Sequence, residues 1–203
     1  MIFVDLSIEP MGDLMDEDTL LTFIGEIAGE CYNSSKARQS CINRALTCIK
    51  NGHHSPWEHY NLTFKCVVDR GVSHALVRHR HCAFQQSSTI YQRYKDDIKI
   101  VGNALDVPGR EYRLYEKAEE TYHDSINKGV APSRARDVLP TALATNLIIT
   151  TNIREYMYIL QRRVGPGDSD NMHKFAALLR EQFKKFYPKI LKAFDAWYLN
   201  HPL

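Results

Sequence analysis

Alternating apolar and polar residues predict a strand at residues 60–69. Every second position is apolar there, as expected for a strand that buries one face. The predicted buried face consists of Leu62, Phe64, Cys66 and Val68. A short apolar segment at residues 2–6 predicts a first strand. The β-branched run at residues 143–151 fits either a strand or a buried helical segment.

Apolar residues at helical spacing occur in several longer segments. The first follows the acids at residues 16–18, whose charges suit a helix N-terminus. Its apolar positions are Leu20, Leu21, Phe23, Ile24 and Ile27. Further helices are predicted at residues 37–50, 72–80, 110–128, 153–163 and 171–186, with a short one from Ala131 that stops before Pro140. Residues 84–94 are predicted to be extended, and residues 53–59 a loop fixed by Pro56.

This mixture of strands and long helices predicts an α/β fold of the mixed α+β kind. No stretch is rich enough in proline, glycine or serine to separate domains. We therefore expect residues 1–203 to form a single domain.

Composition narrows the class of protein. Hydrophobic residues make up 44% of the chain and charged residues 25%, which is ordinary for a soluble globular protein. A net charge of +2 argues against nucleic acid as the partner. The five cysteines are odd in number and form no Cys-x-x-Cys pair, which fits a reduced, cytoplasmic protein. We see no signal peptide and no membrane-spanning stretch, so no membrane partner is expected.

The most distinctive chemistry lies between Arg78 and Tyr91. Arg78, His79 and Arg80 are followed after seven residues by Ser88. Fixed positive charge beside a short polar run suits a phosphorylated ligand. The alternative is that the cluster is a solvated helix face, as most such clusters are.

Three segments in order resemble one enzyme family. The first reads His-x-Ser-Pro-x-Glu-His at residues 53–59. The second is Arg-His-Arg-x7-Ser at residues 78–88, followed by Tyr91. The third comprises Ala-Arg-x-Val-Leu-Pro at residues 135–140, then Asn152-x-Arg154 and Arg163. From about residue 50 to 185 the chain resembles the flavin-dependent thymidylate synthases, the ThyX family.

The resemblance implies an FAD-dependent methyltransferase that makes dTMP from dUMP. Methylenetetrahydrofolate would donate the carbon and NADPH the reducing equivalents, with FAD as the hydride carrier. It also implies a ThyX-like domain with a central sheet and flanking helices, in a homotetramer that shares its active sites between subunits. The residues placed at FAD would be His53, Ser55, Arg78, His79, Arg80, Gln85, Asn152 and Arg154. Those placed at the nucleotide would be Gln86, Ser87, Ser88, Arg136 and Arg163.

Three of these residues are candidates for the catalytic group: Ser88, Arg163 and His53. An arginine against the uracil edge stabilises charge that builds on the ring oxygens as carbon 5 attacks the one-carbon unit. Arg162 and Arg163 are adjacent, so only one of them can point into a given site, and the resemblance to the family assigns this role to Arg163. Ser88 would position the nucleotide by hydrogen bonding rather than act as an obligatory nucleophile.

The chain departs from the family pattern on the nucleotide side. The family usually has a glutamate just before the motif serine, and an arginine two residues after it that helps hold the nucleotide phosphate. Here these places read Gln86, Ser87 and Ile90. Arg93 could replace that arginine only across a bulge or a turn, because positions 90 and 93 face opposite sides of a regular strand. Tyr158 and Gly167 also replace an asparagine and a histidine common in the family.

These departures leave alternatives open. The substrate could be another pyrimidine nucleotide such as dCMP, the product could be hydroxymethylated, or the chain could be a flavin- or nucleotide-binding homologue without catalysis. Arg136 could instead interact with the end of its own helix. Cys82 is either a nucleophile or, more simply, a buried thiol. The histidines at positions 53, 54 and 59 match no standard zinc spacing, so no metal is expected.

Overall fold

The computed structural model describes residues 1–102 and 107–201. The chain divides into two compact units. Unit 1 consists of Met1–Ser7, Cys66–Arg78 and Phe84–Ile148. Unit 2 consists of Ile8–Lys65, His79–Ala83 and Ile149–Leu203.

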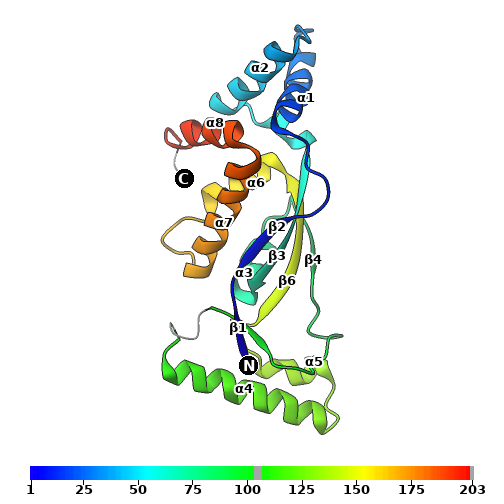
Figure 1. Ribbon diagram of the computed structural model, residues 1–203, viewed down its shortest axis with the longest axis vertical. Helices are drawn as coiled ribbons and strands as arrows, with labels where there is room; N and C mark the ends of the chain where they lie inside the picture. The colour runs from blue at the N-terminus through cyan, green and yellow to red at the C-terminus, as the bar shows by residue number, and fades with distance from the viewer. Residues whose placement is uncertain (103–106, 202–203) are drawn as a thin grey trace. The chain divides into compact units, whose positions relative to one another are not determined.

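Strands and helices are interspersed along the chain (Figure 1). The strands are β1 (Ile2–Val4), β2 (Ser7–Pro10), β3 (Asn61–Asp69), β4 (Ala83–Gln86), β5 (Lys99–Val101) and β6 (Ala144–Asn152). The α-helices are α1 (Glu17–Glu30), α2 (Arg38–Lys50), α3 (Arg70–Leu76), α4 (Gly109–Asn127), α5 (Pro132–Ala135), α6 (Ile153–Arg162), α7 (Asp170–Phe186) and α8 (Pro188–Tyr198). Two 3₁₀ helices are η1 (Ser55–His59) and η2 (Arg136–Val138).

The strands form two sheets. One is four-stranded in the order β2-β3-β6-β4, and the other pairs β1 with β5 in parallel. β3 and β6 run in opposite directions: in unit 2 the amide of Ile153 donates to Tyr60, and in unit 1 the amide of Arg70 donates to Leu143. The mixed α/β fold predicted from the sequence is confirmed.

β3 confirms the alternation read from the sequence. Leu62, Phe64, Cys66 and Val68 are all at most 1% exposed, and their neighbours are more open. β6 shows the same alternation, with Leu147 and Ile149 buried. Residues 144–152 are therefore a strand and not a buried helix.

An aromatic chain forms the core of unit 2. Phe64 on β3 meets Tyr156 on α6 edge to face at 5.4 Å between ring centroids, and Phe183 on α7 lies 6.0 Å beyond. The hydroxyl oxygen of Tyr156 lies 3.2 Å from the carbonyl oxygen of Leu62 and 3.1 Å from that of Ile149, so its hydrogen is donated to these carbonyls. This bond satisfies the one polar atom of a ring that is otherwise fully buried. The arrangement fixes α6 against β3 and β6.

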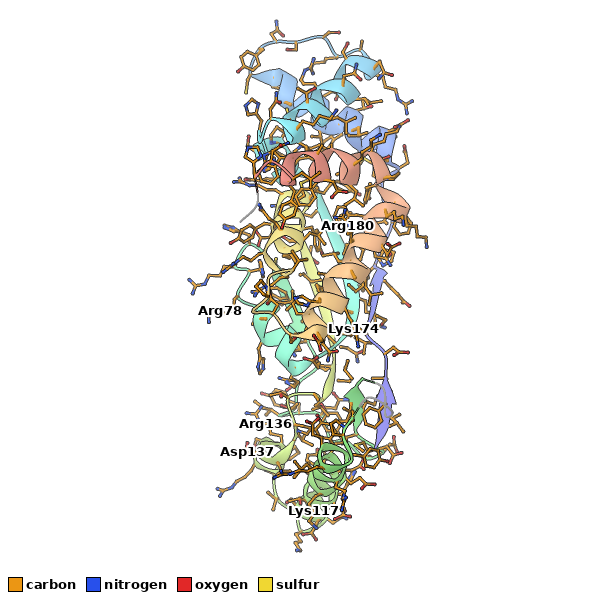
Figure 2. The ribbon with its side chains drawn as sticks, turned by 90° about the vertical axis from the view of Figure 1, so that its left-hand side faces the viewer. Arg78, Lys117, Arg136, Asp137, Lys174 and Arg180 are labelled. Atoms are coloured by element: carbon orange, nitrogen blue, oxygen red, sulfur yellow. The ribbon has the colours of Figure 1, made fainter. Side chains whose placement is uncertain are left out.

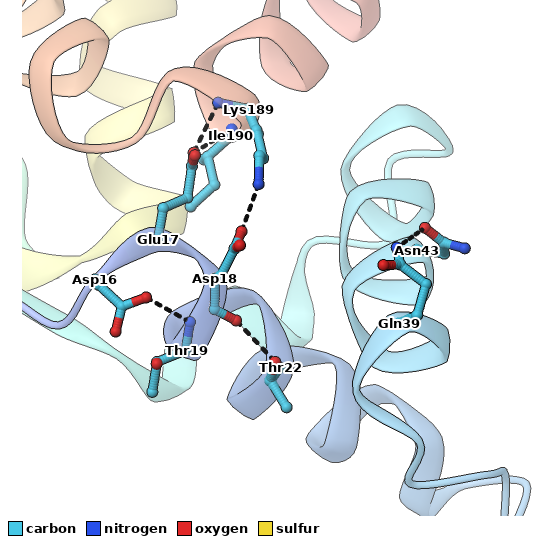
Figure 3. Close-up of polar contacts among 9 residues, drawn as sticks. All are labelled: Asp16, Glu17, Asp18, Thr19, Thr22, Gln39, Asn43, Lys189 and Ile190. Carbon is cyan, nitrogen blue, oxygen red and sulfur yellow. Dashed lines mark hydrogen bonds and ion pairs between the residues drawn. The ribbon is translucent and has the colours of Figure 1, made fainter.

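The start of α1 also holds the start of α8 in unit 2 (Figure 3). Asp16 caps α1, its carboxylate accepting from the amide of Thr19 at 3.0 Å. The next carboxylate, of Glu17, accepts from the amides of Lys189 and Ile190 at 2.7 and 3.0 Å. Those amides belong to the first turn of α8, where no intrahelical acceptor exists. A side chain of α1 therefore serves as the cap that α8 lacks.

Unit 1 has its own smaller core. Ile98, Ile100 and Leu143 are at most 1% exposed, with Phe3 and Tyr115 packed against them. Tyr115 lies on α4, the long helix drawn in green in Figure 1. α4 ends as expected at a glycine: Gly129 has φ +82°, which an L-residue adopts only with strain.

Two predicted elements were wrong in extent. The helix expected over residues 72–80 begins earlier, at Arg70, because Asp69 caps it, and it ends at Leu76. Beyond that end the His81 carbonyl accepts from the Thr151 hydroxyl at 2.8 Å, a tertiary bond that helical continuation would compete with. The extended segment expected over residues 84–94 is a strand only to Gln86.

Three elements escaped prediction. They are β2, β5 and α8. Residues 53–59, expected as a loop, contain the 3₁₀ helix η1, which has Pro56 in its first turn. Within the described residues, no helix combines the length and the apolar character needed to cross a membrane.

Candidate active site

His79 is the centre of a buried polar group in unit 2. Its side chain is only 3% exposed, and its Nδ1 lies 2.9 Å from Oε1 of Glu155 on α6. On the other side of the ring, Nε of Arg163 donates to Nε2 of His79 at 3.0 Å. Arg163 follows the last residue of α6, so both partners come from one helix.

The partners of His79 fix its protonation. A guanidinium only donates hydrogen bonds, so Nε2 of His79 must be the unprotonated nitrogen. The ring hydrogen is then on Nδ1 and is donated to the carboxylate of Glu155. The pKa of His79 is lowered from its usual value, chiefly because burial disfavours the imidazolium, with Arg163 and Arg162 adding to this and Glu155 opposing it. The neutral imidazole of His79 therefore links the carboxylate of Glu155 to the guanidinium of Arg163.

Arg163 is further held by Asp168. Its Nη1 lies 3.3 Å from Oδ1 of Asp168, and the two side chains are 18% and 16% exposed. Its neighbour Arg162 is exposed. Of the two adjacent arginines, Arg163 is therefore the one that the structure brings to His79.

The N-terminus of α6 positions Glu155. Asn152 precedes the helix and its side-chain oxygen accepts from the amide of Glu155 at 2.9 Å. Asn152-x-x-Glu155 is a capping-box spacing. Here, however, the glutamate side chain turns to His79. The cap and the buried pair thus share Glu155, the cap through its amide and the pair through its carboxylate.

A cavity of about 500 Å³ opens beside this group in unit 2. Aromatic and apolar side chains line much of it: Met157, Tyr158, Phe194 and Trp197. Polar lining residues include His54, Glu58, Asn152 and Arg154, the last two predicted from the sequence as cofactor contacts. Arg154 forms an ion pair with Glu58.

One buried atom at this cavity has no partner. Nε2 of His54 is inaccessible and makes no hydrogen bond in the described structure. The pKa of His54 is lowered, first by burial, so this nitrogen is an unprotonated acceptor when Nδ1 holds the hydrogen. Aromatic faces and a guanidinium at one cavity, with an unsatisfied imidazole nitrogen behind its wall, fit a flavin nucleotide, which offers a ring to stack and phosphates to bind.

Ser88 forms a tight turn in unit 1. Its hydroxyl oxygen accepts from the amides of Ile90 and Tyr91 at 3.1 and 3.4 Å. The amide of Gln92 donates back to the Ser88 carbonyl at 3.2 Å. This local capping explains why the chain leaves the extended conformation after Gln86.

Gln86 and Arg136 are held by neutral hydroxyls in unit 1. The amide nitrogen of Gln86 lies 2.8 Å from Ser73 Oγ and 3.3 Å from Thr145 Oγ1. Its amide hydrogens are thus engaged, and its carbonyl oxygen is the group left to accept. Nη1 of Arg136 donates to Oγ1 of Thr89 at 3.0 Å. Arg136 therefore contacts the turn next to Ser88.

Comparison with known proteins identifies the family of this chain. The model of the family described as "Thymidylate synthase complementing protein" matches residues 15–189. The chain belongs to this family.

Curated relatives cover most of the chain. A flavin-dependent thymidylate synthase of Synechocystis is 25% identical over 166 residues, covering 73% of this chain and 77% of its own. A probable flavin-dependent thymidylate synthase of Paramecium bursaria Chlorella virus 1 is 29% identical over 167 residues, with the same coverages. The Kosmotoga olearia enzyme is 26% identical over 200 residues, covering 83% of this chain and 87% of its own.

The fold has a counterpart among solved structures. The UMP/dUMP methylase PolB from Streptomyces cacaoi, bound with 5-Br dUMP, superposes with a TM-score of 0.80 at 21% identity. The match covers 97% of this chain and 98% of that one. Together the comparisons confirm three predictions: the family, the mixed α/β fold, and a flavin-dependent methyltransferase of the thymidylate synthase type.

The residues predicted for this family's site fall into both units. His53, Ser55, His79, Arg80, Asn152, Arg154 and Arg163 belong to unit 2, and Arg78, Gln85, Gln86, Ser87, Ser88 and Arg136 to unit 1. Within unit 2 the structure brings together His79 and Arg163, and separately Asn152 and Arg154 at the cavity. Arg78, Arg80 and Gln85 are exposed, as Figure 2 shows for Arg78. His53 and Ser55 are also exposed, and the imidazole at the cavity is that of His54.

The turn at Ser88 bears on the departures from the family pattern. Ile90 is 42% exposed and lies in the turn. Arg93 could replace the arginine missing at position 90 only across a bulge or a turn, and a turn is present at these residues. Arg93 lines a cavity with Ser87, but so do the carboxylates Asp5, Asp96 and Asp97.

The sequence did not reveal Glu155 or His54. The spacing of Asn152 and Glu155 could have identified Glu155 as a capping residue, but nothing local points to a partner 76 positions away. His54 was considered only as a loop cap or as part of a metal site.

Proposed function

We propose that this enzyme methylates dUMP to dTMP, with methylenetetrahydrofolate as carbon donor, FAD as bound flavin and NADPH as reductant. The observation that carries the proposal is the fixed guanidinium of Arg163, held by His79 at 3.0 Å and Asp168 at 3.3 Å. A preorganised cation beside a pyrimidine ring stabilises negative charge on the ring oxygens while carbon 5 attacks. The flavin-dependent relatives and the PolB structure with its dUMP analogue support this reading.

Residues of this chain have distinct roles in the proposal. Asn152, Arg154 and the aromatic cavity wall would hold the flavin, with His53, Ser55, Arg78, His79, Arg80 and Gln85 as further contacts. When bound, the flavin supplies the hydride that the one-carbon transfer requires. Gln86, Ser87, Ser88, Arg136 and Arg163 would contact the nucleotide. His53 would take part in catalysis beside Ser88 and Arg163.

Ser88 acts as a positioning group in this scheme. Its oxygen already accepts two backbone amides, so its lone pairs are engaged and its hydrogen remains to be donated. Within the proposal the chain works as one domain, in a cytoplasmic homotetramer whose active sites are shared between subunits.

Gln86 makes a second substrate worth testing. Its amide nitrogen is engaged by Ser73 and Thr145, and its carbonyl oxygen can accept from N3–H of uracil or from the amino group of cytosine. dCMP is therefore the natural alternative substrate, with a methyl or hydroxymethyl product.

The deciding experiment starts from purified protein with its flavin photoreduced without oxygen. Methylenetetrahydrofolate is added with either dUMP or dCMP, and the nucleotide is analysed by mass. We expect flavin reoxidation and dUMP that has gained a methyl group in place of hydrogen. Bound flavin with unchanged dUMP would contradict the proposal. The dCMP sample then distinguishes another substrate from a homologue without catalysis.

A further inference from the structure

A short turn carries the carboxylate that pairs with Arg163. It spans residues 165–168 and lies between α6 and α7. The amide of Asp168 donates to the carbonyl of Gly165 at 3.1 Å, which closes the turn, and Pro166 restricts its second position. The carboxylate of Asp168 therefore reaches Arg163, at 3.3 Å, from a defined piece of backbone.

His173 attaches that turn to α7. Its Nε2 lies 2.9 Å from the carbonyl oxygen of Gly165, the same oxygen that accepts from the amide of Asp168. Because a carbonyl only accepts, Nε2 of His173 carries the hydrogen. His173 lies near the start of α7 and is partly buried. We call this contact between His173 and Gly165 the turn clamp.

Two contacts determine the orientation of the Arg163 guanidinium. Its Nε donates to His79 at 3.0 Å, and one such hydrogen bond leaves a planar group able to rotate about the contact. The second contact, from Nη1 to Asp168, fixes the direction in which the plane points. Orientation matters because a donor stabilises developing charge only when it is aimed at that charge beforehand.

The series of contacts is continuous within unit 2. It runs from His173 through the turn to Asp168 and Arg163. Arg163 and Asp168 are 18% and 16% exposed, so solvent screens their attraction less than that of a surface pair. The ion pair of Arg180 with Asp195, also in unit 2, is 44% and 35% exposed and serves as a comparison.

We propose that Asp168 and His173 are positioning residues of this enzyme. Asp168 sets the plane of the Arg163 guanidinium against the pyrimidine ring, and His173 acts through Asp168 by holding the turn. The inference rests on the proposed function and deepens it, because neither residue belongs to the motifs read from the sequence. Both act on the transition state, since the charge that Arg163 stabilises builds up only as carbon 5 attacks.

The test is steady-state methylation of dUMP by the full-length, flavin-loaded protein. Asp168→Ala should lower kcat about ten- to a hundredfold with little change in KM, because a misdirected guanidinium loses contacts made only in the transition state. His173→Ala should lower kcat about fivefold, the usual loss for one neutral hydrogen bond. Asp168→Asn keeps an acceptor and His173→Gln keeps a donor, so each should recover part of the loss.

A double variant separates positioning from a general effect on stability. If His173 acts only through Asp168, the variant with both alanines should lose no more than Asp168→Ala alone. Two matched controls should keep the wild-type kcat. One is Asp195→Ala, which breaks the ion pair with Arg180, and the other is Lys174→Ala, which removes the exposed neighbour of His173 labelled in Figure 2.

Several results would overturn the inference. They are an unchanged kcat in Asp168→Ala, a loss confined to KM, independent losses that multiply in the double variant, or an equal loss in Asp195→Ala. Thermal unfolding and flavin content are measured for every variant. Where an alanine variant does not fold, Asp168→Asn and His173→Gln take its place: a lowered kcat in either supports the inference, and a wild-type kcat in both overturns it.

Limited digestion with trypsin distinguishes failure of the inference from failure of the proposed function. Cleavage after Arg163 requires local opening of the chain, so its rate reports on the turn clamp without turnover. Both alanine variants should be cut there faster than the wild type, and the two controls should not. If the wild type methylates no pyrimidine nucleotide, the proposed function falls, while faster cleavage retains the turn clamp. Unchanged cleavage in both variants overturns the turn clamp whatever the activity.

Discussion

One ring proton determines how His79 connects its neighbours. With the hydrogen on Nδ1, the ring accepts from Arg163 and donates to Glu155. A second proton could only enter at Nε2, where it would remove the acceptor that Arg163 uses. The charged groups around the ring are Glu155, Arg163 and Arg162. The orientation of Arg163 therefore depends on His79 staying neutral.

Activity should fall as pH drops through the folded-state pKa of His79. Because that pKa is lowered, the neutral form persists below the usual range of a histidine, and the acid limb lies there. Glu155→Gln keeps an acceptor for Nδ1–H but removes the charge that raises this pKa, so the acid limb of kcat/KM should move to lower pH. The pH profile of Glu181→Gln, an exposed carboxylate on α7, should match the wild type. An acid limb that stays in place in Glu155→Gln would contradict this role.

The lowered pKa of His79 also makes the free energy of unfolding fall as pH drops. A buried histidine whose folded pKa is depressed binds its proton more readily in the unfolded chain. The contribution of His79 to the free energy of unfolding is thus present above its unfolded pKa and is lost as pH falls toward the folded one.

The thiols of Cys66 and Cys82 should be unreactive in the native protein. Burial raises the pKa of Cys66 to about 12 and that of Cys82 to about 11, so little thiolate forms at pH 8. Alkylation followed by mass analysis should modify the exposed Cys31 first and these two only after unfolding. Turnover by Cys82→Ser should persist. Its loss, with normal folding, would revive Cys82 as a nucleophile.

Among the single residues, His79 and Arg163 could be predicted from the sequence, but their contact with each other and with Glu155 could not. Their types and order matched a motif, and motifs record residues near each other in the chain. The contact between His79 and Glu155 spans 76 positions and exists only after α6 has packed.

The elements follow the sequence most closely where packing is regular. β3 has the predicted face because strict alternation leaves one register that buries apolar side chains. α3 and the segment after Gln86 differ from the predicted elements in extent. Hydrogen bonds that the hydrophobic pattern does not record, tertiary beyond α3 and local after Gln86, determine where they end. Among these, the Ser88 hydroxyl terminates an extended run that looked continuous. α8 was missed although Pro188 marks its first turn, and its cap comes from Glu17, 172 residues earlier.

Close helix packing makes Gly25 sensitive to substitution. In unit 2, α1 and α2 lie side by side (Figure 1), and a Cβ at Gly25 would stand 2.0 Å from the carbonyl oxygen of Cys41. Gly25→Ala must therefore separate the helices, at a cost of about 1–3 kcal/mol of unfolding free energy.

Gly109→Ala is the matched control for this prediction. It lies in the first turn of α4 with nothing within 4 Å of the added Cβ. Denaturant unfolding should show a change below about 1 kcal/mol, in either direction. Equal losses in the two variants would mean that the helix contact is not what constrains Gly25.

Over the whole molecule, the predicted nucleotide residues fall into both units. Arg136 belongs to unit 1 and Arg163 to unit 2. The single domain expected from the sequence remains a prediction, since a division by contacts does not test independent folding. Two compact units were not foreseen, because the chain has no linker between them to mark a boundary.

Shared active sites would allow inactive variants to complement each other. Arg136→Ala and Arg163→Ala should each lose methylation. Mixed and allowed to exchange subunits, they should recover part of the activity if one site takes these arginines from different chains. Analytical ultracentrifugation gives the oligomeric state of each protein. A mixture that stays inactive despite exchange would show that one chain supplies both residues.

The neutral ring of His79 has a use beyond its role in holding Arg163. A hydrogen on a buried Nδ1, bonded to a carboxylate 2.9 Å away, exchanges slowly with solvent and resonates apart from backbone amides. Nitrogen-15 labelling of histidine therefore gives a spectroscopic reporter that needs no chemical tag. Any ligand that pulls Arg163 away from Nε2 will change the signals of both ring nitrogens, so that engagement of the guanidinium can be followed without turnover.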